Sequence, residues 1–555
     1  MISNANQIAK DSQLTADICI VGSGAAGIAM ALALSGKGLS IVLLEAGFTK
    51  QDSQSQALYA GEVVDEALHS PPDKYRQRRF GGSTAIWGGR CMPVDAIDLE
   101  PRDYIPNSGW PIRYAELAPF FIEANALAEA GDFEYDADQV FDAQTQAMFQ
   151  GFSSDVVRTK SLERFSCPTH FGRRYEKRLR LAKDIEVFLG ANCTAINLTA
   201  DGSAVKQLQV ATLAGNRFTV KATNVVLATG GIEVARLMLA SRDIKPNGVG
   251  NEYDVVGRYY QCHIAGNVGK LTINGPISKV RHGYEISPEG IYCRRRLSLT
   301  AAEQRRLGVG NLVARLHFPS ISDPNHGNGV LSGLFLAKHF ISYEYGKRLN
   351  DGGKTNLSTY IKHLLNIVSD PIDTVAFAYN WLTKRTLAER KFPSVILRNK
   401  TNRFSLEIHG EQIPQAESRI TLTDEMDALS MPKVKIDWRY HPQDIDSVKR
   451  SLEVIAAEFA RTNLGSFEFN PQQLEHDLTR FGAYGGHHIG TARMGDNPKT
   501  SVVDANCKVH TASNLYVASS AVFPTSSQAN PTLTIIALAL RLAEHLSPQL
   551  THPAA

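Results

Sequence analysis

The stretch "ADICIVGSGAAGIAMALALSGKGLSIVLLEAG" (16–47) decides the fold. It passes from an apolar strand through a glycine-rich turn and a helix of small residues to a second apolar strand that ends at Glu45. This order predicts a βαβ unit that binds a dinucleotide, because Gly22 allows a tight turn, Gly24 lets a pyrophosphate approach the backbone, and Gly27 lets the helix lie close to the sheet. Glu45 is placed to accept a ribose hydroxyl. The unit alone leaves both FAD and NAD open.

The overall composition excludes several classes of protein. The chain has 555 residues, which predicts two intertwined domains, and its 59 Lys and Arg against 56 Asp and Glu give a net charge of only +3. Such a balance provides no broad positive face, so nucleic acid is not expected as a partner. The seven cysteines are scattered and never form a CxxC pair, which argues against a disulfide framework or a zinc site.

Targeting and membrane signals are weak. The first residues, "MISNANQIAKDSQLTA" (1–16), are polar and do not resemble a secretion signal, so we expect a cytoplasmic protein without an integral membrane segment. The apolar stretch 533–546 is interrupted by Arg541 and predicts a buried helix. Residues 358–385 have helical apolar spacing and a basic end; they predict a helix that covers the substrate domain, and contact with a membrane or a partner is the alternative.

Three further segments fit a large planar cofactor. The loop "RRFGGSTAIWGGR" (78–90) places four glycines around a Ser-Thr pair and Trp87, so its backbone can run flat against a ligand. Residues 224–239 form a strand, a Gly-Gly turn and a helix, and residues 514–546 form a strand, a loop with prolines and a helix. Asn530 precedes Pro531, which disfavours the helical conformation and can fix the amide at a corner, although helix capping would explain Asn530 equally well.

Together with "HHIGTARMG" (487–495) and "ANPTLTIIALAL" (529–540), these motifs resemble the glucose-methanol-choline (GMC) family of FAD-dependent oxidoreductases. The resemblance extends over nearly the whole chain in the expected order, and only about 265–405 matches nothing. It implies an α/β and α+β fold in which a discontinuous Rossmann-like FAD-binding domain carries a substrate domain built on an antiparallel sheet. We assign 1–100, 185–260 and 485–555 to the first domain, and 101–184 and 261–484 to the second.

In that family the catalytic histidine is the first residue of an HxxGT pattern, which corresponds to His487. Adjacent side chains of an extended segment point to opposite faces, so His488 is expected to pack inside the protein. The resemblance implies that His487 takes the proton of the substrate hydroxyl while the hydride leaves for flavin N5. The second family position, often histidine, is Asn530 here, whose amide would orient the hydroxyl and stabilise developing negative charge.

The cofactor predicted from these motifs is FAD, held without a covalent bond. Some sugar oxidases of the family attach FAD through a histidine of the loop, where this chain has Ala85, Ile86 and Trp87. The family's frequent Asp after "YVA" is Ser519 here, which puts that contact in doubt. The predicted cofactor-binding residues are Gly22, Ser23, Gly24, Ala25, Ala26, Gly27, Glu45, Ala46, Arg79, Gly81, Gly82, Ser83, Thr84, Trp87, Gly88, Gly89, Cys193, Ala228, Thr229, Gly230, Ser519, Ser520 and Thr532.

The short motifs look most like the branch of pyranose oxidases and glycoside 3-dehydrogenases. The leading hypothesis is therefore oxidation of a secondary hydroxyl of a sugar or glycoside to a ketone. Tyr379, Asn380 and Trp381 could bind a sugar, or simply pack in a helix. A non-sugar alcohol oxidoreductase and a non-redox flavin enzyme similar to hydroxynitrile lyases are the alternatives. Oxygen, a quinone and a redox protein are all compatible as electron acceptor.

Overall fold

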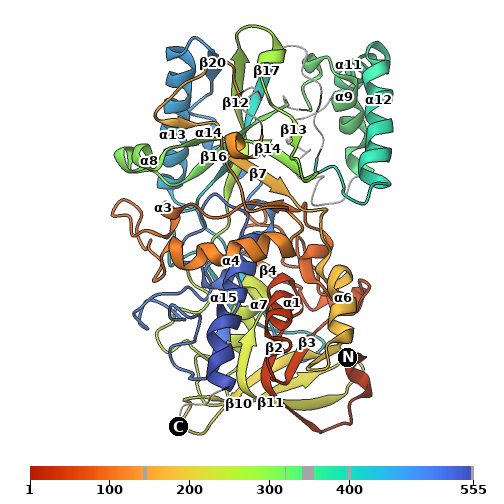
Figure 1. The fold of residues 1–555 in the computed structure, drawn as a ribbon, viewed down its shortest axis with the longest axis vertical. Helices are drawn as coiled ribbons and strands as arrows, with labels where there is room; N and C mark the ends of the chain where they lie inside the picture. The colour runs from red at the N-terminus through yellow and green to blue at the C-terminus, as the bar shows by residue number, and fades with distance from the viewer. Residues whose placement is uncertain (142–146, 319–320, 341–355, 395–396, 398–401, 552–555) are drawn as a thin grey trace.

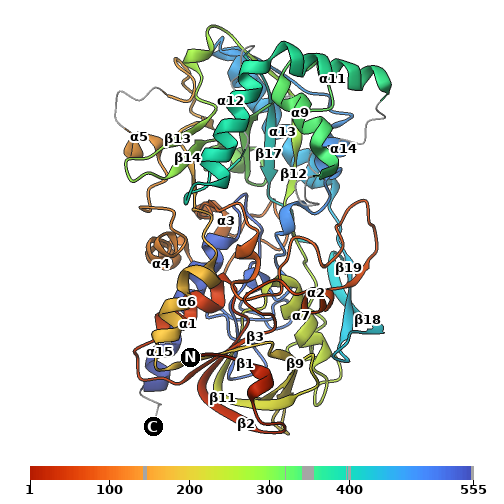
Figure 2. The same ribbon diagram turned by 90° about the vertical axis from the view of Figure 1, so that its right-hand side faces the viewer.

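The computed structural model describes residues 1–141, 147–318, 321–340, 356–394, 397 and 402–551. Two halves lie along the long axis, with both chain ends in the lower half (Figure 1). The lower half contains an eight-stranded sheet, and the upper half contains a six-stranded sheet with helices on either side (Figure 2).

The lower sheet is a Rossmann-like sheet with an antiparallel extension. Its strands are, in order, β1 (Ile2–Asn4), β8 (Ile185–Leu189), β3 (Ile41–Glu45), β2 (Gln13–Val21), β11 (Arg217–Leu227), β10 (Val205–Ala211) and β9 (Asn192–Leu198), with β21 (Leu515–Val517) also on β11. In this order, β1, β8, β3, β2 and β11 each run parallel to the next strand, and β21 runs parallel to β11. β10 is antiparallel to both β11 and β9. The βαβ unit predicted for 16–47 is confirmed as β2, α1 (Ala25–Leu34) and β3.

Apolar helices cover this sheet. The small residues of α1 are nearly all buried, because the helix packs between the sheet and α15 (Thr532–Thr551). The predicted burial of 533–546 is confirmed, with Leu533, Ile536 and Leu540 in the core. The strand and helix expected in 224–239 are the end of β11 and α7 (Gly230–Ala240).

The upper half is built on antiparallel strands. The six-stranded sheet has the order β20 (Gly465–Glu468), β12 (Ile264–Ile273), β17 (Arg403–Gly410), β16 (Leu312–His317), β15 (Leu297–Leu299) and β6 (Val157–Arg158). A four-stranded sheet follows the order β13 (Tyr284–Ile286), β14 (Tyr292–Arg295), β7 (Leu162–Phe165) and β5 (Arg90–Cys91). The helices of this half include α5 (Ala137–Val140), α8 (Ala301–Leu307), α9 (Gly329–Ala337), α11 (Leu357–Ser369), α12 (Pro371–Trp381), α13 (Pro442–Arg461) and α14 (Leu474–Thr479).

Two segments assigned from sequence to the substrate domain pack on the lower half instead. The sequence of 418–440 predicts a hairpin, which forms as β18 (Arg419–Met426) and β19 (Pro432–Asp437). β19 pairs in parallel with β4 (Gly61–Val63), and the hairpin lies beside α7 (Figure 2). Arg236 of α7 fixes it there by donating to the carboxylate of Asp427 at 2.7 Å and to the carbonyl of Pro432 at 2.8 Å.

Within 101–184, α4 (Tyr114–Leu127) packs on α15, and α6 (Phe171–Leu181) packs on α1. Their apolar faces bury Leu117, Phe121 and Leu179 in the core of the lower half. An amphipathic pattern shows which face of a helix is buried but not which partner covers it. The domain limits proposed from sequence stay a prediction.

The segment 358–385 forms two helices rather than one. α11 ends at Ser369 and α12 begins at Pro371, because proline cannot donate the hydrogen bond that a continuous helix would need there. Among the described residues, no helix is long and apolar enough to cross a membrane.

Candidate active site

The glycine-rich turn after β2 forms one wall of a large cavity. A Cβ on Gly27 would lie 1.9 Å from the carbonyl oxygen of Gly22, so only glycine lets α1 start this close to the turn. A Cβ on Gly24, in contrast, would meet nothing within 4 Å and would project into open space. No side chain caps α1 at Gly24, so its first backbone N–H groups are available to an anionic ligand.

Glu45 ends β3 beside this turn, as the sequence predicts. Its carboxylate is buried and accepts hydrogen bonds from the backbone N–H of Ser23 at 3.1 Å, the hydroxyl of Ser23 at 2.5 Å and the backbone N–H of Gly47 at 2.7 Å. A carboxylate has about four acceptor positions, so one is left for a ribose hydroxyl. Glu45 therefore also stiffens the turn, a role that the sequence did not indicate.

The loop 78–90 lies against the glycine-rich turn. The backbone N–H of Gly81 donates to the carbonyl of Ser23 at 3.0 Å, and the hydroxyl of Thr84 donates to the carbonyl of Gly81 at 2.5 Å. The indole N–H of Trp87 donates to the carbonyl of Thr169 at 3.0 Å, which fixes the ring. The loop is thus an ordered wall of the cavity rather than a surface loop.

The cavity has a volume of about 1240 Å³ and extends from the glycine-rich turn to the substrate sheet. Most of the residues predicted from sequence line it: Gly22, Ser23, Gly24, Ala25, Ala26, Glu45, Ala46, Arg79, Gly82, Ser83, Thr84, Trp87, Gly88, Cys193, Ala228, Thr229, Gly230, His487, Ser519, Ser520, Asn530 and Thr532. Three predicted residues are not in its lining, namely Gly27, Gly81 and Gly89. Gly81 and Gly89 have positive φ angles and abut the segment 166–172, so they shape the loop and do not face the cavity.

The residues present fit FAD. The uncapped start of α1 provides N–H groups for the pyrophosphate, and Glu45 lies where the ribose would be. Thr229 also lines the cavity, and its hydroxyl is buried without a hydrogen-bond partner in the part of the chain that the structure describes. A buried hydroxyl of this kind normally finds a partner, so it points to a polar ligand at this place.

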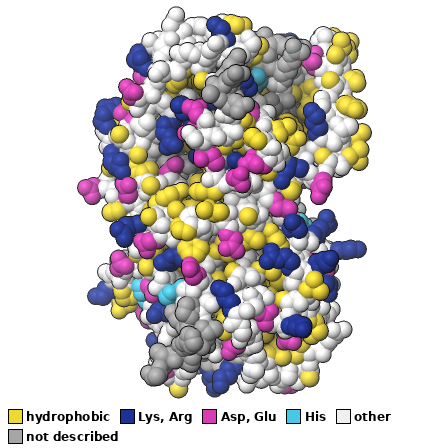
Figure 3. Space-filling view, viewed as in Figure 1, with side chains coloured by type: hydrophobic (Ala, Val, Ile, Leu, Met, Phe, Trp, Pro, Cys, Tyr) yellow, Lys and Arg dark blue, Asp and Glu magenta, His cyan; other side chains and the backbone are white. Residues whose placement is uncertain are grey.

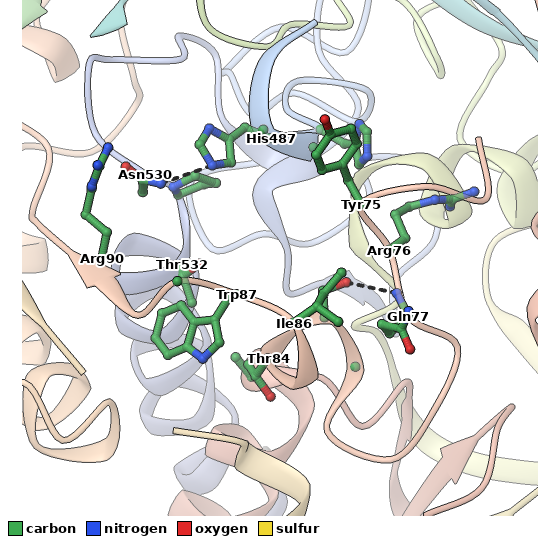
Figure 4. Close-up of a pocket in the computed structure, with 18 of the residues that line it drawn as sticks. Tyr75, Arg76, Gln77, Thr84, Ile86, Trp87, Arg90, His487, Asn530 and Thr532 are labelled. Atoms are coloured by element: carbon green, nitrogen blue, oxygen red, sulfur yellow. Dashed lines mark hydrogen bonds between the residues drawn. The ribbon is translucent and has the colours of Figure 1, made fainter. Parts of the chain in front are cut away.

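His487 and Asn530 both line the cavity and point toward each other (Figure 4). The amide nitrogen of Asn530 donates to Nε2 of His487 at 3.1 Å, and Nδ1 of His487 lies 2.8 Å from Nδ1 of His263. With the Asn530 amide in this orientation, Nε2 holds the lone pair, and the imidazole proton lies on Nδ1, where His263 accepts it. The arrangement leaves the basic nitrogen of His487 on the Asn530 side.

Burial keeps these imidazoles neutral. The pKa of His487 lies well below its usual range because the ring is removed from water, and the neighbouring His263 and Arg90 lower it further. Burial lowers the pKa of His263 to about 3. His409 stacks on His263 with ring centroids 4.1 Å apart. The pKa of His409 lies well below its usual range, mainly because the ring is buried and secondly because of electrostatic repulsion from His263. His487 is therefore an unprotonated base across the neutral and mildly acidic range.

His488 also lines the cavity, but its ring lies in a hydrogen-bond chain separate from that of His487. Its Nδ1 is 2.5 Å from the hydroxyl of Tyr260, which is itself 2.8 Å from Nε2 of His69. Nδ1 of His69 lies 2.6 Å from the carbonyl of Ser70. The two adjacent histidines thus serve different neighbours.

A cluster of buried charges lies behind the catalytic pair. Arg315 and Glu163 form an ion pair whose side chains are fully buried, and Nε of Arg90 lies 3.5 Å from the same carboxylate. Burial alone would raise the pKa of Glu163, but Arg315 and Arg90 outweigh it and lower this pKa. Glu407 is 3.4 Å from Arg294 in the same region. Arg90, Arg294 and Glu407 also line the cavity.

Sequence reasoning missed several of these residues. His263 immediately precedes β12, and no sequence motif assigned it a role. His409, Glu407 and Arg294 come from β17 and β14, which carry no motif that we could recognise. Of Tyr379, Asn380 and Trp381, only Trp381 lines the cavity, whereas Tyr379 and Asn380 are exposed.

Comparisons with known proteins agree with this geometry. Residues 414–539 match a family model described as GMC oxidoreductase, and residues 16–261 match one described as pyridine nucleotide-disulphide oxidoreductase. The chain is 23% identical to paromamine 6'-oxidase of Streptomyces fradiae, over 98% of this chain and 93% of that protein. It is 32% identical to a C-glycoside 3-oxidase of Microbacterium trichothecenolyticum, but over only 25% of this chain and 26% of that one.

Among solved structures, a pyridoxine 4-oxidase from Mesorbium loti has the same fold. The TM-score is 0.52 at 18% identity, covering 95% of this chain and 98% of that one. The comparisons do not separate the branches of the family. With the cavity, the uncapped helix start and the family matches taken together, the chain is an FAD-dependent oxidoreductase that acts on CH–OH groups, and its residues 414–539 match the GMC oxidoreductase family.

Proposed function

We propose that the protein oxidises a secondary hydroxyl of a sugar or glycoside to a ketone, with His487 as the base. The observation that carries this proposal is the His487–Asn530 pair, which faces the end of the cavity formed by the polar substrate sheet. Bound FAD would accept the hydride from the carbinol carbon. The relatives named above as a paromamine oxidase and a C-glycoside oxidase support a substrate of this class.

The proton chemistry follows from the hydrogen bonds of His487. Its Nε2 lone pair takes the hydroxyl proton, while the proton on Nδ1 stays shared with His263. Asn530 cannot titrate, and its amide N–H groups can donate to the substrate oxygen as negative charge develops there. The pair therefore consists of one base and one fixed donor.

The substrate sheet supplies polar contacts for a polyhydroxylated molecule. Asn267 of β12 lies directly opposite Glu407 of β17, and His317 of β16 lies opposite Ser405 of β17. All four residues line the cavity. Carboxylate, amide, hydroxyl and imidazole groups that line one wall of the cavity suit a substrate with several hydroxyl groups.

A second candidate is an amphipathic or apolar alcohol. α9 and α12 contribute an apolar wall to the same cavity, with Val330, Leu334, Phe377 and Trp381. A purely polar sugar would leave this wall unused. The wall favours a substrate in which an apolar group is joined to the oxidised ring or chain.

We also propose that FAD is held without a covalent bond. Ile86 and Trp87 line the cavity at the loop position where a histidine would be needed for attachment. Neither side chain can form such a bond.

The pH dependence of substrate oxidation should reflect the buried base. An imidazole with the ordinary pKa near 6.5 would lose roughly three quarters of its neutral form at about pH 6. Because the pKa of His487 lies well below its usual range, the rate of flavin reduction should change less than about twofold between pH 8 and pH 6. Anaerobic stopped-flow reduction with saturating substrate measures this rate without the oxidative half-reaction. A rate that falls with an apparent pKa near 6.5 would show that the base is an exposed group.

The test of the function itself is anaerobic bleaching of the flavin spectrum. We expect a yellow protein whose flavin is released by acid precipitation and is reduced by at least one pyranose or glycoside. Simple aliphatic and aromatic alcohols serve as the comparison set. Reduction by apolar alcohols alone would move the assignment to the second candidate, and a protein that cannot be loaded with FAD would overturn both.

A further inference from the structure

The outer face of α11 and α12 is an exposed apolar surface. Its side chains are between 49% and 81% exposed, and they are Leu357, Ile361, Leu364, Leu365, Val368, Ile372, Val375 and Tyr379. Figure 3 shows apolar side chains along the upper right edge, where Figure 1 places these two helices. A continuous patch of this kind on a folded chain marks a contact with another apolar phase or partner.

The inner faces of the same helices already have partners. His363 of α11 lies 2.9 Å from the hydroxyl of Ser332 and stacks on Phe335 of α9 with centroids 4.1 Å apart. Phe377 and Trp381 of α12 face the cavity. The side chains of the outer face therefore take no part in the contacts that pack α11 and α12 against the rest of the protein.

The exposed charges within the two helices and the turn after them are basic, the acidic ones there are only partly exposed, and Glu389 just beyond is exposed. Within 356–387, the exposed charged side chains are Lys362 and Lys384. Asp370 and Asp373 are only partly exposed, and the carboxylate of Asp370 accepts a hydrogen bond from the backbone N–H of Gly329 at 3.2 Å. The two helices therefore combine an exposed aliphatic face with two exposed lysines nearby in the chain, a combination that is complementary to a surface that is apolar inside and anionic at its edge.

The composition favours lipid over protein as the partner. Cores of protein interfaces are enriched in aromatic residues and Arg and carry many direct hydrogen bonds. This face is dominated by Leu, Ile and Val, with Tyr379 towards one end. Amphipathic helices that lie in a membrane interface combine a face of this type with lysines on its border. Since no described helix can cross a bilayer, such a contact would be superficial.

We propose that the outer face of α11 and α12 docks the enzyme on an anionic lipid bilayer, with both helices lying in the plane of the interface. The apolar side chains enter the boundary between headgroups and acyl chains, and Lys362 and Lys384 contact the headgroups. Because the opposite face of α12 lines the cavity, docking brings a wall of the active-site cavity to the bilayer surface.

The test is flotation of the FAD-loaded full chain with vesicles. One set contains phosphatidylcholine alone, and the other contains equal parts of phosphatidylcholine and phosphatidylglycerol. We expect binding to the anionic set. Leu365→Glu/Ile372→Glu should weaken it about tenfold or more, because both side chains would have to leave the acyl region. Lys362→Ala/Lys384→Ala should weaken it roughly 25-fold on anionic vesicles only, since each lysine near such a surface is worth about fivefold.

A matched control places the same charges elsewhere. Ile122 of α4 and Leu181 of α6 are 62% and 70% exposed in the lower half, so Ile122→Glu/Leu181→Glu should bind vesicles as the wild type does. All variants should keep the flavin spectrum and the thermal midpoint, because the altered side chains are at the surface. Flotation does not depend on turnover, so its result is independent of the proposed substrate.

Two outcomes would overturn the proposal. The first is a wild-type protein that stays with neither set of vesicles. The second is a dimer, measured by light scattering, that Leu365→Glu/Ile372→Glu converts to a monomer while vesicle binding is absent or unchanged. In that case the face joins two copies of the chain.

Discussion

His487→Ala should keep its bound FAD and lose about 10² to 10⁴ of the rate at which substrate reduces the flavin. The loss is expected because Nε2 of His487 is the basic nitrogen beside Asn530, and the pKa of this ring, lowered by burial and by His263 and Arg90, keeps it unprotonated. Anaerobic stopped-flow spectroscopy gives the rate, and the absorbance ratio of flavin to protein gives the cofactor content. Added imidazole should restore part of the rate, since the cavity left by the side chain can hold it.

His488→Ala is the matched control for this prediction. Its ring is bonded to Tyr260 and not to Asn530, so the variant should retain the flavin and reduce it within about tenfold of the wild-type rate. If His488→Ala were inactive and His487→Ala active, the assignment of the base would be wrong. Equal losses in both variants without imidazole rescue would indicate that the segment is structural.

Glu163→Ala should lower the free energy of unfolding by about 3–5 kcal/mol. The substitution leaves Arg315 charged and fully buried beside Arg90, with no carboxylate from β7 to balance them. Guanidinium titration of the FAD-loaded protein, followed by flavin and tyrosine fluorescence, measures the change.

Two further variants make this prediction specific. Glu163→Ala/Arg315→Met removes both charges of the pair and should recover much of the lost stability, because an apolar pair of similar volume often replaces a buried ion pair at little cost. Glu176→Ala removes the partner of Arg180 on the exposed side of α6, and it should cost less than about 1 kcal/mol. A small effect of Glu163→Ala would mean that Arg315 is neutralised by other groups, with Glu407 the first to examine.

The FAD-binding part of the fold could be predicted from sequence because its signals are local. The stretch 16–47 contains its own strand, turn and helix, and the spacing of Gly22, Gly24 and Gly27 is required by backbone contacts that the structure shows. The alternation of polar and apolar residues in 187–220 likewise predicts antiparallel strands, which are present as β9, β10 and the start of β11, although β8 joins the parallel part of the sheet. Each of these predictions depends on neighbours within about thirty residues.

Placement between distant segments could not be predicted in the same way. The hairpin of β18 and β19 was recognised, but its partner β4 lies more than 350 residues earlier in the chain. The spacing of 358–385 showed an amphipathic segment, and the break at Pro371 and the outward direction of its apolar face became visible only in the structure.

The candidate site likewise contains some residues that the sequence identified and others that only the fold brings together. The positions of His487 and Asn530 followed from a family resemblance, and the structure brings them to 3.1 Å. His263 and the charge cluster come from segments without a motif, and only the fold makes them neighbours. Buried histidines and arginines of this kind look like ordinary core or surface residues until their partners are known.

The alternation of β17 has a consequence for how such an enzyme could change its substrate over evolutionary time. Ser405, Glu407 and His409 line the cavity, whereas Phe404 and Leu406 belong to the core cluster behind the sheet, and Ile408 contributes to both. Substitutions at the cavity-facing positions of this strand can therefore change contacts with the substrate, while the core-facing residues keep the sheet packed. None of these positions lies in the glycine-rich turn or the loop 78–90. The substrate specificity could thus change during evolution while the flavin-binding residues stay the same.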